Sequence, residues 1–294
     1  MENYDLAIII VSYNTEKITK NCLDSIYRST KSSDLKYQII IVDNNSLDNS
    51  VKMLQEYARK KDNMSLIINT ENVGFGRANN QAVKIAKSKY ILFLNSDIVV
   101  LENSINQLLS FYKKHYETHF LGGKLYNTDM TPQPSTAYFF TLPVVFAALF
   151  LKGDYWGLTR SSSNKFKQVD WIAGACILTQ KKYFSSVGGF DENVFMYMEE
   201  VDLLYRAKLK GYNTYFYPDS KFVHLGFAST GSKSYPVIQV FKGLVYFYKK
   251  HFSKNKLLGL SVILKAKAVI SLLIGRVTNN KYLIETYEKA YKLA

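Results

Sequence analysis

The stretch LAIIIVSYN, residues 6–14, joins a run of branched apolar side chains to a polar end. A continuous apolar run is typical of a strand buried on both faces, as in parallel sheets covered by helices. YQIIIVDNNS (37–46) repeats the pattern, and shorter apolar runs follow at 65–69 and 90–97. These four segments predict the parallel strands of one sheet.

Amphipathic segments alternate with these strands. Apolar side chains recur at helical spacing in residues 15–30, and residues 48–61, 75–87 and 102–114 predict further helices. This alternation indicates an α/β domain with a mainly parallel central sheet and flanking helices. Open sheets of this kind bind ligands at the carboxyl ends of their strands.

Each predicted strand ends in side chains that form hydrogen bonds: SYN (12–14), VDNNS (42–46), NTENVGFG (69–76) and NSD (95–97). No strand is followed by the glycine patterns of a dinucleotide site or a P-loop. A phosphate would need another partner, and a metal ion is the obvious candidate. Arg77, close behind the third strand, offers a forked guanidinium that suits a diphosphate.

After the fourth predicted helix the pattern changes. The apolar residues 138–153 are too few to span a bilayer and are broken by Pro143, so they form either a core segment or an interfacial patch. Residues 161–168 are polar and predict a mobile loop. Residues 169–180 predict a strand with a small centre, and residues 211–226 predict a strand pair that ends near a histidine.

Three carboxylates crowd the stretch FMYMEEVDLLYR (195–206). Like charges at this spacing repel, and each is costly to bury without compensation. Asp202 and Arg206 can pair at i,i+4 on the predicted helix, which leaves Glu199 and Glu200 at the helix start, where the helix dipole stabilises negative charge. The acids either decorate a helix start or move a proton, and the apolar lead-in favours the second.

The net charge of +14 is concentrated at the end of the chain. Residues 237–294 hold eleven Lys or Arg against two Glu, which is +9 of the total. Such a field suits anionic lipid or nucleic acid, or belongs to a solvated helix with no partner. Within it the apolar residues 257–275 carry Lys265 and Lys267 near the middle, which favours an interfacial helix over a membrane span.

The amino-acid composition indicates a globular protein and the cellular compartment in which we expect it. Hydrophobic residues make up 47% and aromatic residues 15% of the chain, enough for a sizeable core. Cys22 and Cys176 are the only cysteines, so we expect no disulfide framework and a reducing cytosol. Residues 1–14 lack the basic start and cleavage site of a signal peptide.

The order of the sequence motifs along the chain indicates a protein family. VSYN, VDNNSLDNS, NVGFGRANN, LNSD, WIAGACIL, GGFDENVFMYMEEVDL and HLG, within about residues 5–230, resemble the inverting glycosyltransferases of family 2, which have the GT-A fold. The likeness is greatest to bacterial rhamnosyltransferase-type enzymes of surface-polysaccharide assembly. It implies a catalytic domain at 1–236, with a nucleotide-binding half (1–115) and an acceptor half (116–236), and a basic amphipathic helical tail at 237–294.

The resemblance implies a nucleotide site at the strand ends. Asp43 would accept the imide N–H of uracil or thymine. Alternatively, Asp43 and Asn45 merely cap a helix that begins near Leu47. The residues implied for nucleotide binding are Ser12, Tyr13, Asn14, Asp43, Asn45, Asn72, Gly74, Arg77, Asn95 and Ser96.

LNSD stands where the family has its DxD metal motif. Asn95 replaces the first acid, so Asp97 is the remaining anionic ligand. The late histidine of the family implies His224 as a second ligand, although a lone histidine is more often structural. The expected cofactor is Mn²⁺ or Mg²⁺, and mixed imidazole and carboxylate ligation suits Mn²⁺ better.

Inverting transfer needs a base to take the proton of the acceptor hydroxyl. The acid pair of the family corresponds to Glu199–Glu200, which implies Glu200 as base, with Glu199 orienting it or binding the donor sugar. Glu200 stands where the family usually has Asp, so which acid reaches the hydroxyl stays open. The sugar-contacting residues implied are Trp171, Gly174, Ala175 and Asp191.

The implied activity is transfer of a sugar from a nucleotide-diphosphate donor to a hydroxyl of a glycan or polyprenyl-diphosphate-linked acceptor. dTDP-L-rhamnose is the favoured donor, and UDP-hexoses, including galactofuranose donors, stay open. We expect a cytoplasmic enzyme held on the inner face of the cell membrane by residues 237–294, so that deleting them releases it without loss of donor binding. The alternatives are a non-catalytic sugar-nucleotide-binding protein and a nucleic-acid-binding protein; the latter would explain the charge but not the strand-end motifs, and no nucleic acid is expected.

Overall fold

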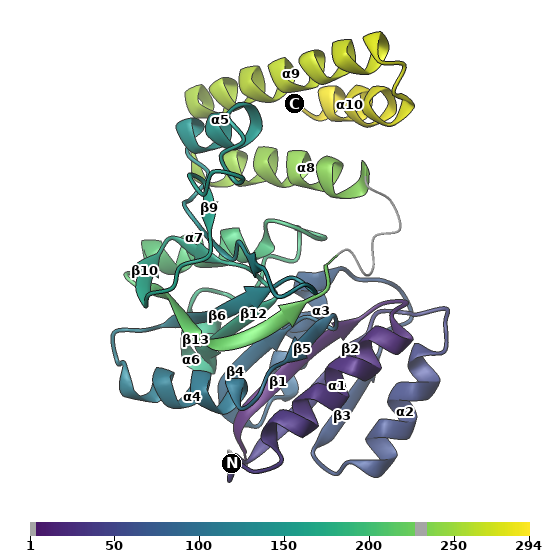
Figure 1. The fold of residues 1–294 in the computed structure, drawn as a ribbon, viewed down its shortest axis with the longest axis vertical. Helices are drawn as coiled ribbons and strands as arrows, with labels where there is room; N and C mark the ends of the chain where they lie inside the picture. The colour runs from purple at the N-terminus through teal and green to yellow at the C-terminus, as the bar shows by residue number, and fades with distance from the viewer. Residues whose placement is uncertain (1–3, 227–233) are drawn as a thin grey trace.

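The computed structural model describes residues 4–226 and 234–294. Strand β1 (Tyr4–Ser12) pairs in parallel with β2 (Tyr37–Asp43) on one side and β4 (Ser88–Leu94) on the other, and β3 (Met64–Ile68) extends the sheet beyond β2 (Figure 1). The parallel strands predicted for the first half are therefore confirmed.

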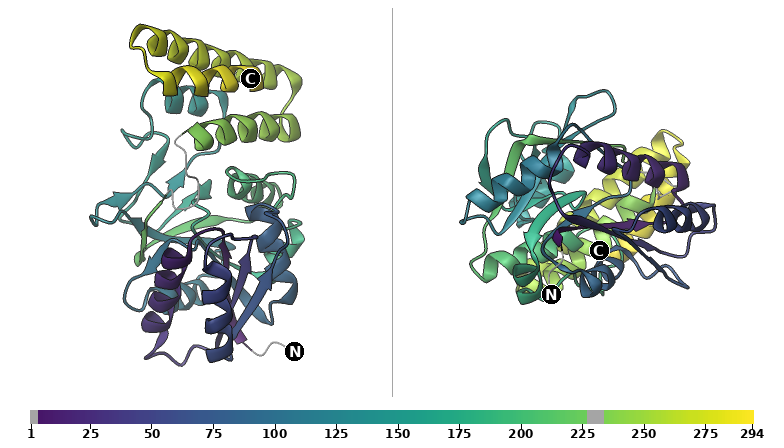
Figure 2. Two further views of the ribbon diagram at one scale, coloured as in Figure 1. Left: turned by 90° about the vertical axis from the view of Figure 1, so that its right-hand side faces the viewer. Right: turned by 90° about the horizontal axis from the view of Figure 1, so that it is seen from below.

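Helices cover both faces of this sheet (Figure 2). They are α1 (Glu16–Thr30), α2 (Ser50–Lys60), α3 (Phe75–Ile85) and α4 (Ser104–Lys114). The side chains of β1 alternate between two hydrophobic clusters: Ile8 and Ile10 pack with α1, α2 and α4, whereas Ala7 and Ile9 pack with α3. Burial on both faces explains why β1 has an uninterrupted apolar sequence.

The second half of the chain extends the same sheet. Its strands are β5 (Ile98–Val100), β6 (Phe120–Tyr126), β7 (Pro132–Gln133), β10 (Lys167–Val169), β12 (Cys176–Gln180) and β13 (Thr214–His224). The order is β10-β13-β6-β12-β4-β1-β2-β3, with β12 antiparallel to both neighbours and β5 paired with β13. A small second sheet consists of β8 (Thr136–Ala137), β9 (Arg160–Ser161) and β11 (Trp171–Ile172).

Several expectations for this half were wrong in detail. Residues 211–226 form one strand, β13, with an irregularity between Tyr217 and Lys221, and not a strand pair. Residues 169–180 divide into β11 and β12, because residues 173–175 leave the ladder. The ends of the predicted loop 161–168 belong to β9 and β10.

The apolar segment 138–153 contains helix α5 (Leu142–Phe150). Pro143 lies in its first turn, where a missing N–H costs nothing, so it begins this helix and does not break the segment. Val145 alone among the residues of α5 is fully buried. The segment is thus only partly a core element.

Helices α6 (Lys181–Ser186) and α7 (Glu199–Leu209) precede the final helical layer of α8 (Ser234–His251), α9 (Lys254–Val277) and α10 (Lys281–Leu293). Helix α8 packs Phe241, Leu244 and Phe247 into the same cluster as α7. Deleting residues from 237 would therefore open the core, so the clean release expected from that deletion does not follow. Helices α9 and α10 lie side by side at the far end from the N-terminus (Figure 1).

Candidate active site

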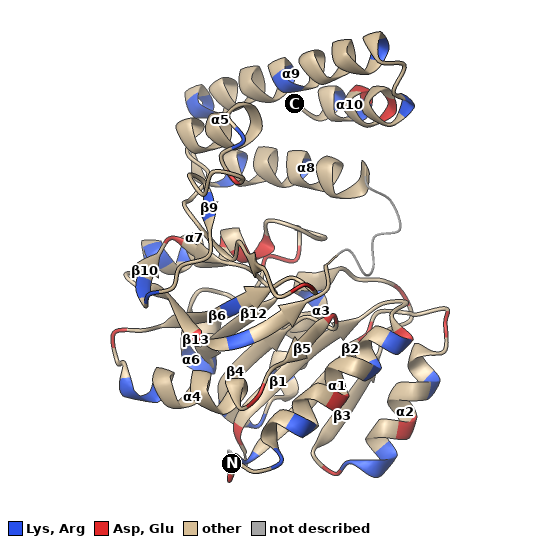
Figure 3. Cartoon of the chain, viewed as in Figure 1, with Lys and Arg blue, Asp and Glu red and all other residues tan. Residues whose placement is uncertain are grey.

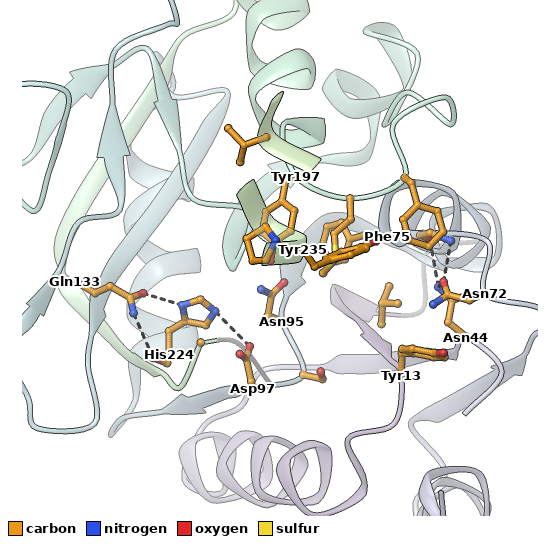
Figure 4. A pocket seen from close by; sticks show the side chains of 18 of the residues that line it. Tyr13, Asn44, Asn72, Phe75, Asn95, Asp97, Gln133, Tyr197, His224 and Tyr235 are labelled. Carbon is orange, nitrogen blue, oxygen red and sulfur yellow. Dashed lines mark hydrogen bonds and ion pairs between the residues drawn. The ribbon is translucent and has the colours of Figure 1, made fainter. Parts of the chain in front are cut away.

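A cavity of about 910 Å³ opens at the carboxyl ends of the parallel strands (Figure 4). This volume suits a small-molecule ligand. Of the residues predicted to bind nucleotide or metal, the cavity is lined by Tyr13, Asn72, Gly74, Asn95, Ser96, Asp97 and His224. Four separate strand ends thus contribute to one site, as the rule for open sheets requires.

Side-chain amides order one wall of the cavity. Asn44 donates through Nδ2 to Asn72 Oδ1 at 3.0 Å and to the Gly74 carbonyl at 3.3 Å, and accepts at Oδ1 from Asn69 at 2.9 Å. Gly74 has a φ of +85°, and a Cβ there would lie 2.7 Å from the Phe195 carbonyl oxygen. A glycine is therefore required where this loop passes the segment that carries the acids.

Asp97 and His224 meet because β5 and β13 pair, with His224 opposite Ile98. Asp97 Oδ1 and His224 Nε2 are 3.3 Å apart. His224 Nδ1 is 2.7 Å from Gln133 Oε1. Because Gln133 Oε1 is an acceptor, this contact orients the imidazole ring with Nδ1 toward Gln133 and Nε2 toward Asp97. Figure 4 shows this chain of contacts at the cavity edge.

These two residues fit a divalent cation as a partial ligand set. A carboxylate oxygen and an imidazole nitrogen face the same space, and the mixture suits Mn²⁺. Within residues 4–226 and 234–294, no group of three or more His, Cys, Asp or Glu side chains is arranged to hold a metal. The remaining ligands would have to be substrate oxygens and water, as is usual for Mg²⁺ bound with phosphates.

The acid pair begins α7 in an unusual backbone setting. Tyr197 and Met198 precede it with φ values of 65° and 72°, in the left-handed region that non-glycine residues rarely adopt. Glu199 is only 6% exposed. The Oε2 atoms of Glu199 and Glu200 are both buried without a hydrogen-bond partner. Backbone strain and unpaired buried carboxylates both cost stability, and such features cluster at functional sites.

Burial is the main cause of the raised pKa values of Glu199 and Glu200. It raises the pKa of Glu199, and the neighbouring Glu200 raises it further. Burial also raises the pKa of Glu200, while the charge of Arg160 acts in the opposite direction. Arg160 lines the cavity and thus supplies positive charge beside Glu200.

Neither Glu199 nor Glu200 is among the cavity-lining residues, but Tyr197 connects them to the cavity. Burial raises the pKa of the Tyr197 hydroxyl to about 12, and the charges of Glu199, Glu200 and Asp97 add to this increase. A single side chain therefore lies within the field of both the acid pair and the candidate metal ligand. The acid pair begins two residues after Tyr197, the last residue of the lining segment 195–197.

Five of the residues predicted to bind nucleotide do not line the cavity. Ser12 is buried among threonine hydroxyls, and Asn14 bonds the backbone of the 46–47 turn. Asp43 accepts from the Ser46 amide at 2.9 Å and from the Ser46 hydroxyl at 2.7 Å, which closes a turn. The next helix, α2, begins at Ser50 with Asn49 as its N-cap, so the alternative of a helix capped near Leu47 was wrong. Asn45 is exposed with a φ of 66°, and Arg77 lies at the surface, 3.6 Å from Glu192.

The predicted sugar-contacting residues also lie outside the lining. Trp171 is 3% exposed and donates to the Tyr138 carbonyl, with its ring 5.4 Å from the Arg160 guanidinium. Gly174 lies beside Glu200, since a Cβ there would be 3.5 Å from Glu200 Cβ. The Ala175 carbonyl accepts from the Asn95 amide, and Asp191 accepts from Tyr246 and Lys250.

Other cavity residues were not predicted. Asn44, Gln133, Arg160, Tyr197 and Tyr235 all line the cavity. Asn44 stands within the polar end of the second strand and Tyr197 within the acidic stretch, so both had a sequence signal. Gln133 and Arg160 come from a segment without periodicity, so the sequence gave no signal for either residue.

With this geometry established, the chain can be placed among known proteins. Residues 7–186 match the family model described as glycosyl transferase family 2, and the chain belongs to that family. The match covers the strands from β1 to β12 and Asp97, and it ends before the acid pair, β13 and His224.

Curated relatives include glycosyltransferases of several kinds. Over 225 residues the chain is 29% identical to the rhamnosyltransferase WbbL of Escherichia coli K12, covering 74% of this chain and 82% of that protein. It is 25% identical to an N-acetylglucosaminyl-diphospho-decaprenol L-rhamnosyltransferase of Mycobacterium tuberculosis, covering 77% and 78%. It matches a poly(ribitol-phosphate) β-glucosyltransferase of Bacillus spizizenii at 36% identity over 40% of this chain, but spans only 18% of that relative.

Solved structures agree on the fold. The Pyrobaculum calidifontis mannosyltransferase PcManGT, solved with GDP-Man and Mn²⁺, aligns with a TM-score of 0.59 at 14% identity, covering 99% of this chain and 86% of that one. TarS residues 1–349 of S. aureus align with a TM-score of 0.55 at 14% identity, covering 98% and 90%. The GT-A fold expected from the sequence is confirmed, with a C-terminal helical region.

Proposed function

We propose that this protein transfers a sugar, with inversion, from a nucleotide-diphosphate donor to an acceptor hydroxyl. The observation that carries the proposal is an acid pair whose two Oε2 atoms are buried without a hydrogen-bond partner and which closely follows Tyr197 in the lining of the cavity that also holds Asp97 and His224. Membership of glycosyl transferase family 2 supports the reaction class.

In this reaction the acceptor oxygen attacks the anomeric carbon while the bond from that carbon to the diphosphate oxygen breaks. Glu200 takes the proton of the acceptor hydroxyl, and Arg160 favours the ionised form of Glu200 that the step needs. Glu199 orients Glu200 or binds donor hydroxyls. Asp97 and His224 would hold Mn²⁺ or Mg²⁺, which would neutralise charge on the leaving nucleoside diphosphate.

The favoured donor is dTDP-L-rhamnose, supported by two rhamnosyltransferases among the relatives. A UDP-hexose or UDP-galactofuranose is the alternative. Tyr13, Asn44 and Asn72 are the polar or aromatic groups available to the nucleoside in the cavity. Asp43 contributes through the turn it holds with Ser46.

We place the enzyme on the cytoplasmic face of the membrane, acting on a glycan or a polyprenyl-diphosphate-linked glycan. Helix α9 supports this, since it is the one helix in the described parts of the chain that is long and apolar enough to cross a membrane. Its inner face is buried through Leu260, Leu264, Ala268, Ser271 and Gly275. The opposite face exposes Leu258, Val262, Val269, Leu273 and Val277, here called the outward stripe.

Helical spacing places Lys265 and Arg276 along one edge of the outward stripe, with Lys267 on the other side of the helix. Figure 3 shows basic residues distributed along α9. One face of α9 packs against protein, and its apolar stripe has basic residues on either side. This pattern favours a helix lying in the interface over one spanning the bilayer.

Thermal unfolding tests donor and metal binding together. A ligand held only by the folded state stabilises it by about 2.7 kcal/mol at 100 times its Kd. We expect dTDP-L-rhamnose with Mn²⁺ to raise the Tm more than UDP-sugars or GDP-mannose do. Asp97→Asn should remove the part of the Tm increase that depends on Mn²⁺. A panel in which no nucleotide sugar shifts the Tm, with or without Mn²⁺, would contradict the proposed function.

A further inference from the structure

The loop between α5 and β9 exposes four large apolar side chains within eight residues. Tyr155 is 78% exposed, Trp156 67%, Leu158 58% and Leu151 53%. Scattered exposed apolar residues are ordinary, but a concentrated cluster of this kind indicates an interaction surface. We call residues 151–158 the aromatic loop.

The aromatic loop is held in shape by its own backbone. The Gly153 amide donates to the Ala147 carbonyl at 3.0 Å, and the Trp156 amide donates to the Lys152 carbonyl at 3.1 Å. The Leu158 amide closes the loop onto the Gly153 carbonyl at 2.8 Å. These bonds hold the apolar side chains outward, so they do not fold back onto the protein.

The loop follows directly after α5, and α5 packs against α9. A Cβ at Gly259 would lie 2.9 Å from Leu142, and Lys267 Nζ is 5.8 Å from the Phe150 ring. Figure 1 shows α5 beside the N-terminal half of α9. The loop is therefore connected through α5 to the helix that carries the outward stripe.

The composition of this surface favours an anionic lipid bilayer as its occupant. Trp and Tyr prefer the boundary between headgroups and acyl chains. Lys152 lies inside the aromatic loop, and Lys254 and Lys256 begin the adjacent helix. Basic side chains beside an apolar surface match a negatively charged membrane.

The other side of the loop reaches the candidate active site. Asp154, next to Tyr155, lines the cavity, as does Arg160 where β9 begins. The Thr159 hydroxyl donates to Asp154. One short segment therefore joins the exposed aromatic rings to the cavity wall.

We propose that Tyr155 and Trp156 insert into the headgroup region of an anionic bilayer and hold the cavity at the membrane surface. The inference rests on the membrane location in the proposed function and extends it, because it adds a second contact that lies outside the tail. The loop orients the enzyme so that an acceptor anchored in lipid reaches the cavity.

Tryptophan fluorescence tests this directly, because the chain has two tryptophans and Trp171 is buried. The probe is a vesicle of phosphatidylcholine with roughly one-third phosphatidylglycerol. We expect a blue shift of the emission and quenching by brominated acyl chains. Both effects should disappear in Trp156→Phe.

A binding measurement supplies the second readout. Tyr155→Ser with Trp156→Ser should weaken vesicle binding by at least about tenfold, since burying one aromatic side chain is worth that much. The Tm and donor affinity should stay unchanged. Tyr116→Ser, which removes an aromatic side chain that is 88% exposed on the connection after α4, is the matched control and should bind vesicles normally.

Three results would overturn the inference. Vesicle binding without a change in Trp156 emission would leave α9 as the anchor and the proposed membrane location intact. A shift that follows protein concentration without vesicles would assign the loop to contacts between copies of the chain. If the protein binds its donor normally but does not bind vesicles, both the proposed membrane location and this inference are contradicted. The proposed sugar-transfer activity is not affected by that result.

Discussion

At the scale of single residues, Glu199 and Glu200 are the feature that packing alone does not explain. Each leaves an oxygen buried without a partner, and burial raises the pKa of both. Two acids in this state lower stability wherever they are ionised. A carboxylate with a raised pKa is also a stronger base, which suits proton removal from a hydroxyl.

Glu199→Gln should stabilise the protein at neutral pH. The pKa of Glu199 is raised above its ordinary value of 4.5 in the folded state. The resulting contribution to folding stability is fully present below pH 4.5 and is lost as the pH rises through the folded-state pKa, because the buried acid then ionises. The glutamine side chain of the variant does not ionise, so this loss of stability at neutral pH does not occur. The Tm should therefore rise by about 2–4 °C for each kcal/mol recovered, with a gain at pH 8 that shrinks below pH 4.5. An equal gain at both pH values would argue against an ionisation effect.

The sequence could reveal only part of this site. Asp97 and His224 were expected as partners, and the structure brings them within 3.3 Å. Gln133, which orients His224, could not be anticipated, because it reaches the site through a two-residue strand with no periodic signal. Asp43 was open to two interpretations, and its bonds to Ser46 show a turn and not a helix cap, because α2 begins only at Ser50.

At the scale of elements, a charge network around the buried Asp202 joins α8 to α7. Asp202, with a side chain 2% exposed, accepts from Arg206 at 2.7 Å, Lys250 at 2.8 Å and His251 at 2.7 Å. Lys250 also bonds Asp191 at 2.6 Å. The predicted i,i+4 pair of Asp202 and Arg206 is confirmed, and the added partners from α8 fix the helix that carries the acids.

Lys250→Met should lower the free energy of unfolding by about 1–3 kcal/mol, because it leaves two carboxylates facing each other with less compensation. Urea unfolding measures this. Lys249→Met is the matched control, since that lysine is exposed and should change stability little. Equal effects of the two substitutions would show that the network does not hold α8.

The same network should make the protein sensitive to acid. Burial tends to raise the pKa of Asp202, but hydrogen bonds and ion pairs from His251, Arg206 and Lys250 outweigh it and lower that pKa. The resulting stability is present above the ordinary value of 3.8 and is lost as pH falls through the folded pKa. Urea midpoints should therefore fall below pH 4, and less steeply in Lys250→Met than in the unsubstituted protein.

Element prediction succeeded where the pattern was local. The strands and helices of the first half each carry their own periodicity. The second half depends on pairs distant in sequence: β13 lies between β6 and β10, and β5 joins β13. Two-residue strands such as β8 and β9 have no period to detect, so their places were not predictable.

At the scale of the whole molecule, α8 links the helical layer to the catalytic half. Its first turns contribute Tyr235, Pro236 and Val240 to the cavity, and its last turn carries Lys250 and His251. A charge count assigned the tail to the membrane from residue 237 onward. The packing indicates instead that α9 and α10 form the outer layer, whereas α8 is shared with the core.

Substitutions on the outward stripe test the membrane location without opening the core. Leu258→Gln, Val262→Gln and Leu273→Gln together should move the protein from the membrane to the soluble fraction, lowering vesicle binding by at least about a hundredfold. Donor affinity and Tm should be retained. Leu209→Gln, at an exposed position at the end of α7, is the control. Retention of the triple variant on membranes would show that the stripe is not an anchor.

The account depends most on proton removal by Glu200, and single-turnover sugar transfer by Glu200→Gln tests it most directly. With donor affinity measured alongside, we predict a transfer rate lower by about 10²- to 10⁴-fold and a donor Kd within about twofold of the unsubstituted protein. A Glu200→Gln variant that transfers sugar at the original rate would contradict the account.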